Sequence, residues 1–390
     1  MNSLILPTAN KALEDYNLKG TPLLAQIHSP QDFDRSALAA AHLITDVLAE
    51  RDPWDTRPAI DWDTTLAFRS WLWDQGLGLA EAMDTAQRGM GVDWETAKEL
   101  IRRTMALAKT RSEPVQVACG AGTDHCDSKS LTTAQEIAGA YETQLEAIEA
   151  AGGQAILMAS RAFTANQLRA DAYHSVYRRL IDGAQEPIIL HWLGDMFDPN
   201  LRGYWGTENV TEASDFVLNL IGENPTKVDG IKISLLDQVH EENFRKRLPI
   251  GVKLYTGDDF NYPDLIKGDG NHFSHALLGI FAAIAPAASQ ALAAHARGDM
   301  QTYQDIFTPT VPLAREIFRA PTRFYKAGIA FLAWLNGLQP HFIMPQGFQA
   351  SRDMTHYAEV FRLADQAGLL LNPDLATQRI KHLLVLHGIH

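Results

Sequence analysis

The sequence predicts a (β/α)8 TIM barrel, followed by a C-terminal helical extension. Between Leu38 and Arg297, eight short apolar runs alternate with longer segments of helical spacing. Runs such as AILMA, PIILHW and VDGIKIS are almost continuously apolar, which is typical of parallel strands buried on both faces. Eight strand–helix units over about 260 residues fit a closed barrel better than an open doubly wound sheet, which remains the alternative.

Each expected element follows from its own pattern. The expected strands are Leu38–Ile44, Leu77–Met83, Val115–Cys119, Gln154–Met158, Pro187–Trp192, Val228–Ile231, Gly251–Tyr255 and His272–Leu277. The expected helices are Thr64–Gln75, Trp94–Lys109, Thr132–Ala151, Asn166–Asp182, Glu208–Ile221, Asp237–Lys246, Asn261–Ile266 and Ala276–Arg297. Two helix starts carry capping signals, because Asp93 precedes one helix and Thr132 is followed three residues later by Gln135.

The pattern changes after Arg297, where helical spacing continues without a strand signal. The helices are expected to break at prolines, namely Pro309, Pro312, Pro321, Pro340 and Pro345. We therefore predict three parts: an N-terminal segment (1–35), the barrel (36–297) and a helical extension (298–390).

Composition narrows the possible partners. The chain has 47 acidic and 34 basic side chains and a net charge of −13, which disfavours nucleic acid and anionic membranes as partners. Cys119 and Cys126 have no second pair, so neither a disulfide framework nor a zinc ribbon is indicated.

Two segments bear on membranes and on localisation. The N-terminus lacks the features of a secretion signal, so we expect a cytoplasmic protein. Ala276–Ala294 carries no charge over 19 residues but contains Pro286 and polar side chains, which favours a buried or subunit-interface helix over a membrane span.

Lys232 is the most informative residue for chemistry. It lies inside an apolar strand (VDGIKIS), where an unpaired ammonium is costly and tends to lose its proton. A neutral amine at neutral pH is what Schiff-base formation with a carbonyl substrate requires. The alternative is a lysine that reaches water at the strand end or pairs with Asp229 or Asp258.

A family resemblance favours the Schiff base. The order PIILHWLGD, VDGIKIS and VKLYTGDD resembles the dihydrodipicolinate synthase and N-acetylneuraminate lyase family of class I aldolases. ACGAG, MDTAQRG and PTRFYKAGIAFLAWLNGL extend the similarity over most of the chain. The resemblance implies that Lys232 forms the imine, that no cofactor or metal is needed, and that the protein is a homo-oligomer, a dimer or tetramer. Ala276–Ala294 and Gly328–Leu335 are expected to supply contact surface.

The chain departs from this family at three places, which marks it as a divergent branch. The tyrosine that a neighbouring subunit supplies in the family has no clear counterpart near Arg161–Phe163. His191 stands where the family has its catalytic tyrosine, and the family's Asn-x-Pro after it is missing. The turn that grips a substrate carboxylate in the family reads Asp84-Thr85-Ala86-Gln87-Arg88, so one hydroxyl survives as Thr85 and an acid replaces the other.

These residues define an expected site at the carboxyl ends of the strands. Lys232 attacks the carbonyl, and His191 moves the proton because imidazole titrates near neutral pH. Thr85 and Ser234 supply hydroxyls, and Arg88 or Arg161 holds an anionic group of the substrate. The remaining expected substrate-binding residues are Asp84, Gly257 and Asp258.

The predicted activity is that of a lyase or aldolase acting on a 2-keto acid or a sugar-derived carbonyl compound. One alternative is a divalent-metal-dependent isomerase or class II aldolase that uses rim residues of suitable type, namely His42, Asp46, Asp124, His125, His191, Asp195 and His275. The other is a catalytically silent ligand-binding barrel, suggested by the missing tyrosine and the altered turn.

Overall fold

The structure is a computed structural model that describes residues 3–24, 26–50 and 57–390. These residues form two compact units. The barrel unit comprises 35–40 and 78–278, and the helical unit comprises the chain up to 34 together with 41–77 and 279–390.

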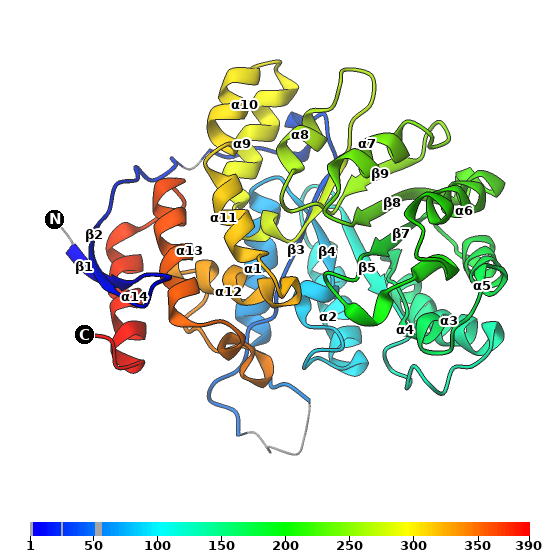
Figure 1. Cartoon of the computed structure of the whole chain (residues 1–390), viewed down its shortest axis with the longest axis horizontal. Coiled ribbons are helices and arrows are strands. Elements are labelled where there is room, and N and C mark those ends of the chain that lie inside the picture. The colour runs from blue at the N-terminus through cyan, green and yellow to red at the C-terminus, as the bar shows by residue number, and fades with distance from the viewer. Residues whose placement is uncertain (1–2, 25, 51–56) are drawn as a thin grey trace. The chain divides into compact units, whose positions relative to one another are not determined.

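The barrel unit contains a closed, all-parallel barrel, which confirms the predicted fold class. The strands run in chain order, and the last strand closes on the first (Figure 1). Their bounds are β3 (Ala37–Ala40), β4 (Gly78–Glu81), β5 (Val117–Ala121), β6 (Gln154–Leu157), β7 (Ile188–Leu193), β8 (Val228–Ser234), β9 (Lys253–Thr256) and β10 (His275–Leu278). Each overlaps one of the eight predicted strands.

The inside of the barrel is filled by side chains rather than open. One layer consists of fully or nearly fully buried residues from seven of the strands, all but β8, and from the turn after β4: Leu38, Ala40, Ala80, Met83, Ala118, Ile156, Ile189, Tyr255 and Leu277. Because side chains alternate between the two faces of a strand, this layer identifies which residues of these strands point inward.

Helices follow most of the strands and have well-formed starts. Those of the barrel unit are α2 (Trp94–Ala108), α3 (Ala134–Ala151), α4 (Arg161–Ala165), α5 (Ala170–Gly183), α6 (Val210–Glu223), α7 (Gln238–Arg245) and α8 (Tyr262–Lys267). The Asp93 side chain accepts from the Thr96 N–H at 2.9 Å, as predicted. The predicted capping box lies one residue later, because Thr133 and Glu136 cap each other.

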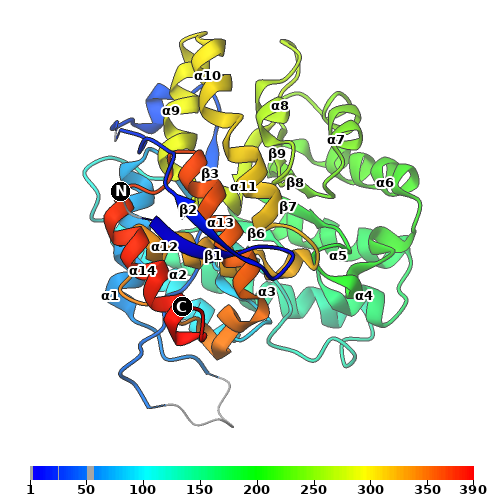
Figure 2. The same cartoon turned by 60° about the vertical axis from the view of Figure 1, so that its left-hand side comes forward.

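The helical unit combines a two-stranded sheet with seven helices among the described residues. These are β1 (Ser3–Pro7), β2 (Leu13–Asn17), α1 (Trp62–Asp74), α9 (Ala285–Ala296), α10 (Met300–Phe307), α11 (Thr310–Ile317), α12 (Tyr325–Leu335), α13 (Met354–Gln366) and α14 (Pro373–Leu386). The β1–β2 pair lies beside α13, and the Tyr16 hydroxyl donates to the Asp365 carboxylate at 2.7 Å (Figure 2). No local sequence pattern predicts this pair of strands.

Two expectations about apolar segments are wrong. The predicted helix Ala276–Arg297 is shorter, because Ala276–Leu278 belong to β10 and α9 begins only at Ala285. The side chains of α9 up to Ala294 and of Gly328–Leu335 are buried within the single chain, so they offer no contact surface to a second copy. Among the described residues, no helix is both long and apolar enough to cross a membrane.

Candidate active site

Lys232 lies in β8 and faces the inside of the barrel. In the strand register it is level with His191 of β7 and with Tyr255 of β9. Tyr255 belongs to the inward-facing layer, and residues level with each other in adjacent parallel strands face the same side. The amine therefore points into the barrel, near the carboxyl ends of the strands, where barrel enzymes place their chemistry.

The surroundings of Lys232 favour a neutral amine. The side chain is half-buried, and none of the described residues forms a hydrogen bond or ion pair with its ammonium. Burial lowers its pKa to about 8, although the charges of Asp259 and Asp84 act in the opposite direction. In about a tenth of the protein molecules the Lys232 side chain is then uncharged at pH 7.

The predicted alternative of a pairing between Lys232 and an adjacent acid is wrong. The Asp229 carboxylate is held at 2.9 Å by the Lys253 ammonium and at 2.7 Å by the Tyr255 hydroxyl. Asp258 accepts backbone N–H groups of its own turn, from Phe260 at 2.8 Å and from Asn261 at 3.0 Å. Neither carboxylate is ion-paired to Lys232.

Gly257 brings the loop after β9 against the amine. A Cβ at this position would lie 2.1 Å from the Ser234 Oγ and 2.7 Å from the Lys232 Cε, so only glycine fits without movement. The next residue, Asp258, shapes the turn, whereas the charge of Asp259 acts on Lys232. The sequence led to Asp258 rather than Asp259, because both acids follow the end of β9 at Thr256, where strand alternation no longer fixes the direction of a side chain.

His191 and Ser234 form a hydrogen-bonded pair next to Lys232. The His191 Nε2 and the Ser234 Oγ are 3.2 Å apart, and the imidazole is only 2% exposed. Its Nδ1 is buried without a hydrogen-bond partner among the described residues. Burial, together with the charge of Lys232, keeps the pKa of His191 well below its usual range. The imidazole is therefore neutral at pH 7.

The turn after β4 carries Asp84 and Thr85. They begin a single helical turn, Asp84–Ala86, that ends at Gln87 in the left-handed conformation, with φ +61°. Thr85 is buried, and Asp84 is close enough for its charge to raise the pKa of Lys232. The structure thus brings together Lys232, Asp84, Gly257 and the His191–Ser234 pair.

Arg88 lies apart from this group and is fully engaged. Its guanidinium donates to the Asp124 carboxylate at 2.5 and 2.9 Å, and to the Gln144 side chain at 2.9 Å. It also donates to the carbonyls of Ala82 and Gly120, at 3.0 and 3.1 Å. These contacts use all three guanidinium nitrogens to link the carboxyl ends of β4 and β5 to the middle of α3, which leaves little capacity for an anionic substrate group.

Arg161, the other predicted anion-binding residue, is the first residue of α4. Its Nε donates to the Asp198 carboxylate at 2.5 Å, and its side chain is 43% exposed. An exposed ion pair of this kind is weak and can be exchanged for a ligand at little cost.

The residues suggested for a metal centre do not gather into one. Among the described residues, no group of three or more His, Cys, Asp and Glu side chains is placed to hold a metal ion. Asp124 is engaged by Arg88 and Gln144, and His125 Nδ1 lies 2.9 Å from the Gln144 amide.

Solved structures similar to this one are dihydrodipicolinate synthases. The enzyme from Aquifex aeolicus is 12% identical, with a TM-score of 0.61 over 91% of this chain and 98% of that one. The enzyme from Thermotoga maritima is also 12% identical, with a TM-score of 0.61 over 86% and 99% of the two chains. The enzyme from Acinetobacter baumannii, solved with pyruvate, is 16% identical, with a TM-score of 0.60 over 86% and 99%. At these identities the similarity shows a shared fold.

Sequence comparison adds one match. A family model described as "Protein of unknown function (DUF993)" matches residues 4–389, which is nearly the whole chain. No curated protein matches the sequence.

Proposed function

We propose that this chain, which belongs to the DUF993 family, is a lyase of the class I aldolase type that forms a Schiff base at Lys232. The observation that carries the proposal is an inward-facing, half-buried amine with a pKa near 8 and no hydrogen bond to a described residue. The fold shared with dihydrodipicolinate synthases supports it, because one of them was solved with a carbonyl compound, pyruvate.

The chemistry follows from the neutral amine. The Lys232 nitrogen attacks the carbonyl carbon of the substrate, water leaves, and an iminium forms. The iminium withdraws electrons, so a carbon–carbon or carbon–oxygen bond next to it can break or form. Protonation of the resulting enamine and hydrolysis of the iminium release the product and restore Lys232.

His191 and Ser234 are assigned to proton transfer. Because His191 is neutral at pH 7, it takes a proton only transiently and passes it on through the Ser234 hydroxyl, 3.2 Å away. Thr85 is assigned a second hydroxyl contact in the same region. Asp84 and Gly257 line the space around the amine.

The proposed substrate is a 2-keto acid or a sugar-derived carbonyl compound. Of the two arginines predicted to hold an anionic group, Arg161 is the better candidate, because Arg88 is engaged by five contacts with the protein. We retain a homo-oligomer and a cytoplasmic location as predictions, with a contact surface other than the two buried segments.

The test is reductive trapping. The protein is treated with cyanoborohydride in the presence of one carbonyl compound at a time, and its intact mass is measured. The carbonyl compounds are pyruvate, hydroxypyruvate, glyceraldehyde and an open-chain ketose. We expect one adduct that maps to Lys232 and is lost in Lys232→Met. A His191→Phe variant should still form the adduct but turn over more slowly. Absence of any Lys232 adduct across the panel would overturn the proposal.

A further inference from the structure

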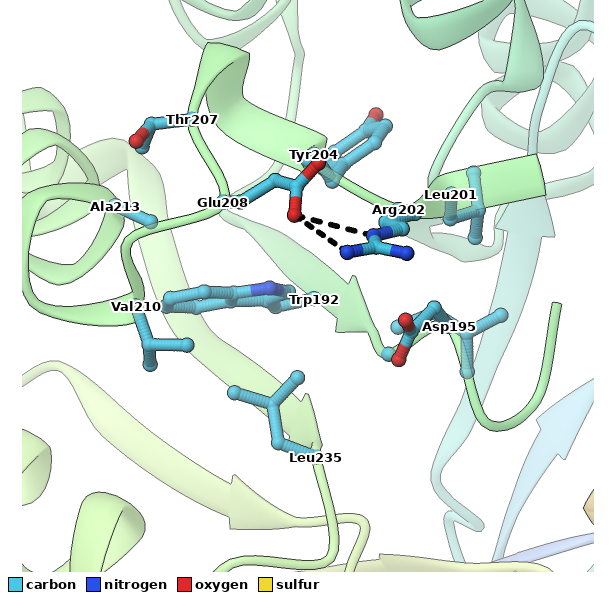
Figure 3. Close-up of a pocket in the computed structure, with 13 residues that line it drawn as sticks. Trp192, Asp195, Leu201, Arg202, Tyr204, Thr207, Glu208, Val210, Ala213 and Leu235 are labelled. Atoms are coloured by element: carbon cyan, nitrogen blue, oxygen red, sulfur yellow. Dashed lines mark hydrogen bonds and ion pairs between the residues drawn. The ribbon is translucent and has the colours of Figure 1, made fainter. Parts of the chain in front are cut away.

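A pocket outside the Lys232 site lies against the other face of β7 (Figure 3). Its volume is about 260 Å³, just below the roughly 300–1,000 Å³ of typical ligand sites, so it suits a molecule smaller than a nucleotide. Its wall comes from the end of β7, the loop that follows it, and the first turns of α6.

Strand alternation separates this pocket from the proposed active site. His191 points into the barrel, so its neighbour Trp192 points outward and borders the pocket. Leu235, which follows Ser234 at the end of β8, borders the pocket as well. A ligand there would occupy the opposite side of the strands that carry Lys232 and His191.

Trp192 offers the pocket an unused donor. The residue is only 4% exposed and its indole N–H donates to none of the described residues, yet its nitrogen is not one of the buried unpartnered atoms, so it opens onto the pocket. A tryptophan N–H at the wall of a pocket can donate to water or to a ligand atom. Figure 3 shows the indole bordering the pocket, with its nitrogen on the side where Glu208 and Arg202 lie. An oxygen atom of a ligand would take the place of water as the acceptor.

The rim of the pocket presents both donors and acceptors. Arg202 donates to the Glu208 carboxylate at 2.8 and 3.1 Å, and both side chains are largely exposed. Asp195 adds a second carboxylate, so the rim carries one more negative than positive charge. An anion would be repelled by this excess, and Arg202 is already neutralised by Glu208. A neutral hydroxylated ligand can accept from Trp192 and Arg202, donate to both carboxylates, and leave the ion pair intact.

Another part of the wall is apolar and would contact carbon atoms. Leu201, Val210, Ala213 and Leu235 line this part, and Figure 3 shows Val210 and Leu235 away from Arg202. Hydroxyl-bearing carbon chains and rings combine C–H surface with groups that both donate and accept hydrogen bonds, which matches the two parts of the pocket.

We propose that this pocket, between β7 and the start of α6, binds a small neutral polyhydroxylated molecule, a monosaccharide or polyol, independently of Lys232. The proposal rests on the unpartnered donor, the mixed rim and the apolar wall, and it does not require the Schiff-base chemistry proposed above.

The test uses ligands that cannot form an imine. Myo-inositol, glycerol and methyl α-D-glucoside lack a free carbonyl, so their binding to the full chain, followed by titration calorimetry and ligand-observed NMR, reports on this pocket. We expect saturable binding of at least one of them, unchanged in Lys232→Met. Choline and inorganic phosphate serve as the cationic and anionic comparisons and should bind at least tenfold more weakly.

Two variants locate the site. Val210→Phe narrows the pocket from a position that is 44% exposed, so the fold should tolerate it. Val239→Phe is the matched control, since Val239 is 67% exposed, lies at the start of α7 and does not line the pocket. We expect at least a tenfold loss of affinity in Val210→Phe and in Trp192→Phe, and none in Val239→Phe. No saturable binding, tighter binding of choline or phosphate, or unchanged affinity in a correctly folded Val210→Phe would each overturn the proposal.

Discussion

Lys232 and Arg88 are both cations enclosed by the barrel unit, yet the protein surrounds them in opposite ways. Arg88 has a protein acceptor for every guanidinium nitrogen, drawn from Ala82, Gly120, Asp124 and Gln144. Lys232 has no hydrogen bond to a described residue and is influenced by two carboxylates only through their charge. Burial is therefore compensated by hydrogen bonds at Arg88, and at Lys232 only in part, by the charges of two carboxylates.

This difference separates a structural cation from a reactive one. A guanidinium stays charged when buried, so it must be paired, and once it is paired it ties three elements together. An ammonium can lose its proton instead, and the resulting amine is a nucleophile. Residue type and burial alone do not distinguish these two outcomes, whereas the set of hydrogen-bond partners does.

The largest expected effect comes from removing the paired cation. Arg88→Met removes the ion-pair partner of Asp124 and a donor to the carbonyls of Ala82 and Gly120, so we expect a loss of roughly 3–5 kcal/mol in the free energy of unfolding. Lys232→Met removes a charge that is compensated only in part and should leave stability equal or higher at pH 7. Urea unfolding of both variants measures the contrast. Equal destabilisation by the two substitutions would contradict the distinction between the cations.

The next largest effect is expected from filling the space next to the Lys232 amine. In Gly257→Ala the added Cβ meets the Ser234 Oγ and the Lys232 Cε, so one of them must move. Displacement of a reacting group by about 1 Å can cost roughly a hundredfold in rate, and we expect a loss of that order in the trapping of Lys232. Gly139→Ala in α3 is the control, because a Cβ there meets nothing within 4 Å. Trapping at the wild-type rate in Gly257→Ala would show that this contact is unimportant.

A smaller effect is expected in the pH dependence of trapping. Because only the neutral amine attacks, the initial rate should rise about tenfold between pH 7 and pH 9 and then level off, as Lys232 deprotonates with a pKa near 8. A free lysine analogue under the same conditions should keep rising toward pH 10. If the protein follows the analogue, the amine is not perturbed by burial.

The barrel was predictable because its strands are buried on both faces. Each strand is a short apolar run that can be recognised locally, and all eight lie within a few residues of the expected bounds. The β1–β2 pair was missed for the opposite reason. Four of the five β2 residues are exposed, and the pair is held by long-range contacts such as Tyr16 with Asp365 of α13, which no local pattern records.

The residues of the candidate site also fall into two groups, those that a local sequence pattern predicts and those that depend on distant contacts. Lys232, His191 and Ser234 lie within strands, where alternation by two fixes which way a side chain points. The role of Arg88 depends on partners 36 and 56 residues away, Asp124 and Gln144, so its position in a turn suggested a free anion-binding group. Asp258 and Asp259 are adjacent acids in a loop, where composition cannot show which one shapes the turn and which one faces the amine.

The smallest expected effect involves a third buried ionisable group, Glu241 of α7, which lies behind the loop that carries Gly257. Its carboxyl accepts from Ser274 at 2.7 Å and from Thr256 at 3.0 Å, and burial raises its pKa to about 8. The folded protein therefore holds a proton that the unfolded chain releases above about pH 4.3, so stability should fall as pH rises from there to about 8. Burial is the largest cause of the raised pKa of Glu241, and the Ser274 and Thr256 hydroxyls and Arg245 act against it by favouring the charged form.

The Glu241→Gln variant tests whether Glu241 causes this loss of stability. It places a polar amide at the position of the carboxyl, and the amide does not titrate. Urea unfolding at pH 5 and pH 8 should show a larger drop in stability for the wild type than for the variant. The pH profile of Lys232 trapping should keep its midpoint near 8 in the variant, since Glu241 contacts Thr256 and Ser274 rather than the amine. A shifted midpoint would mean that the carboxyl behind the loop, and not burial alone, sets the protonation of Lys232. The difference between Arg88 and Lys232 would then depend on Glu241 as well as on the groups that contact each cation directly.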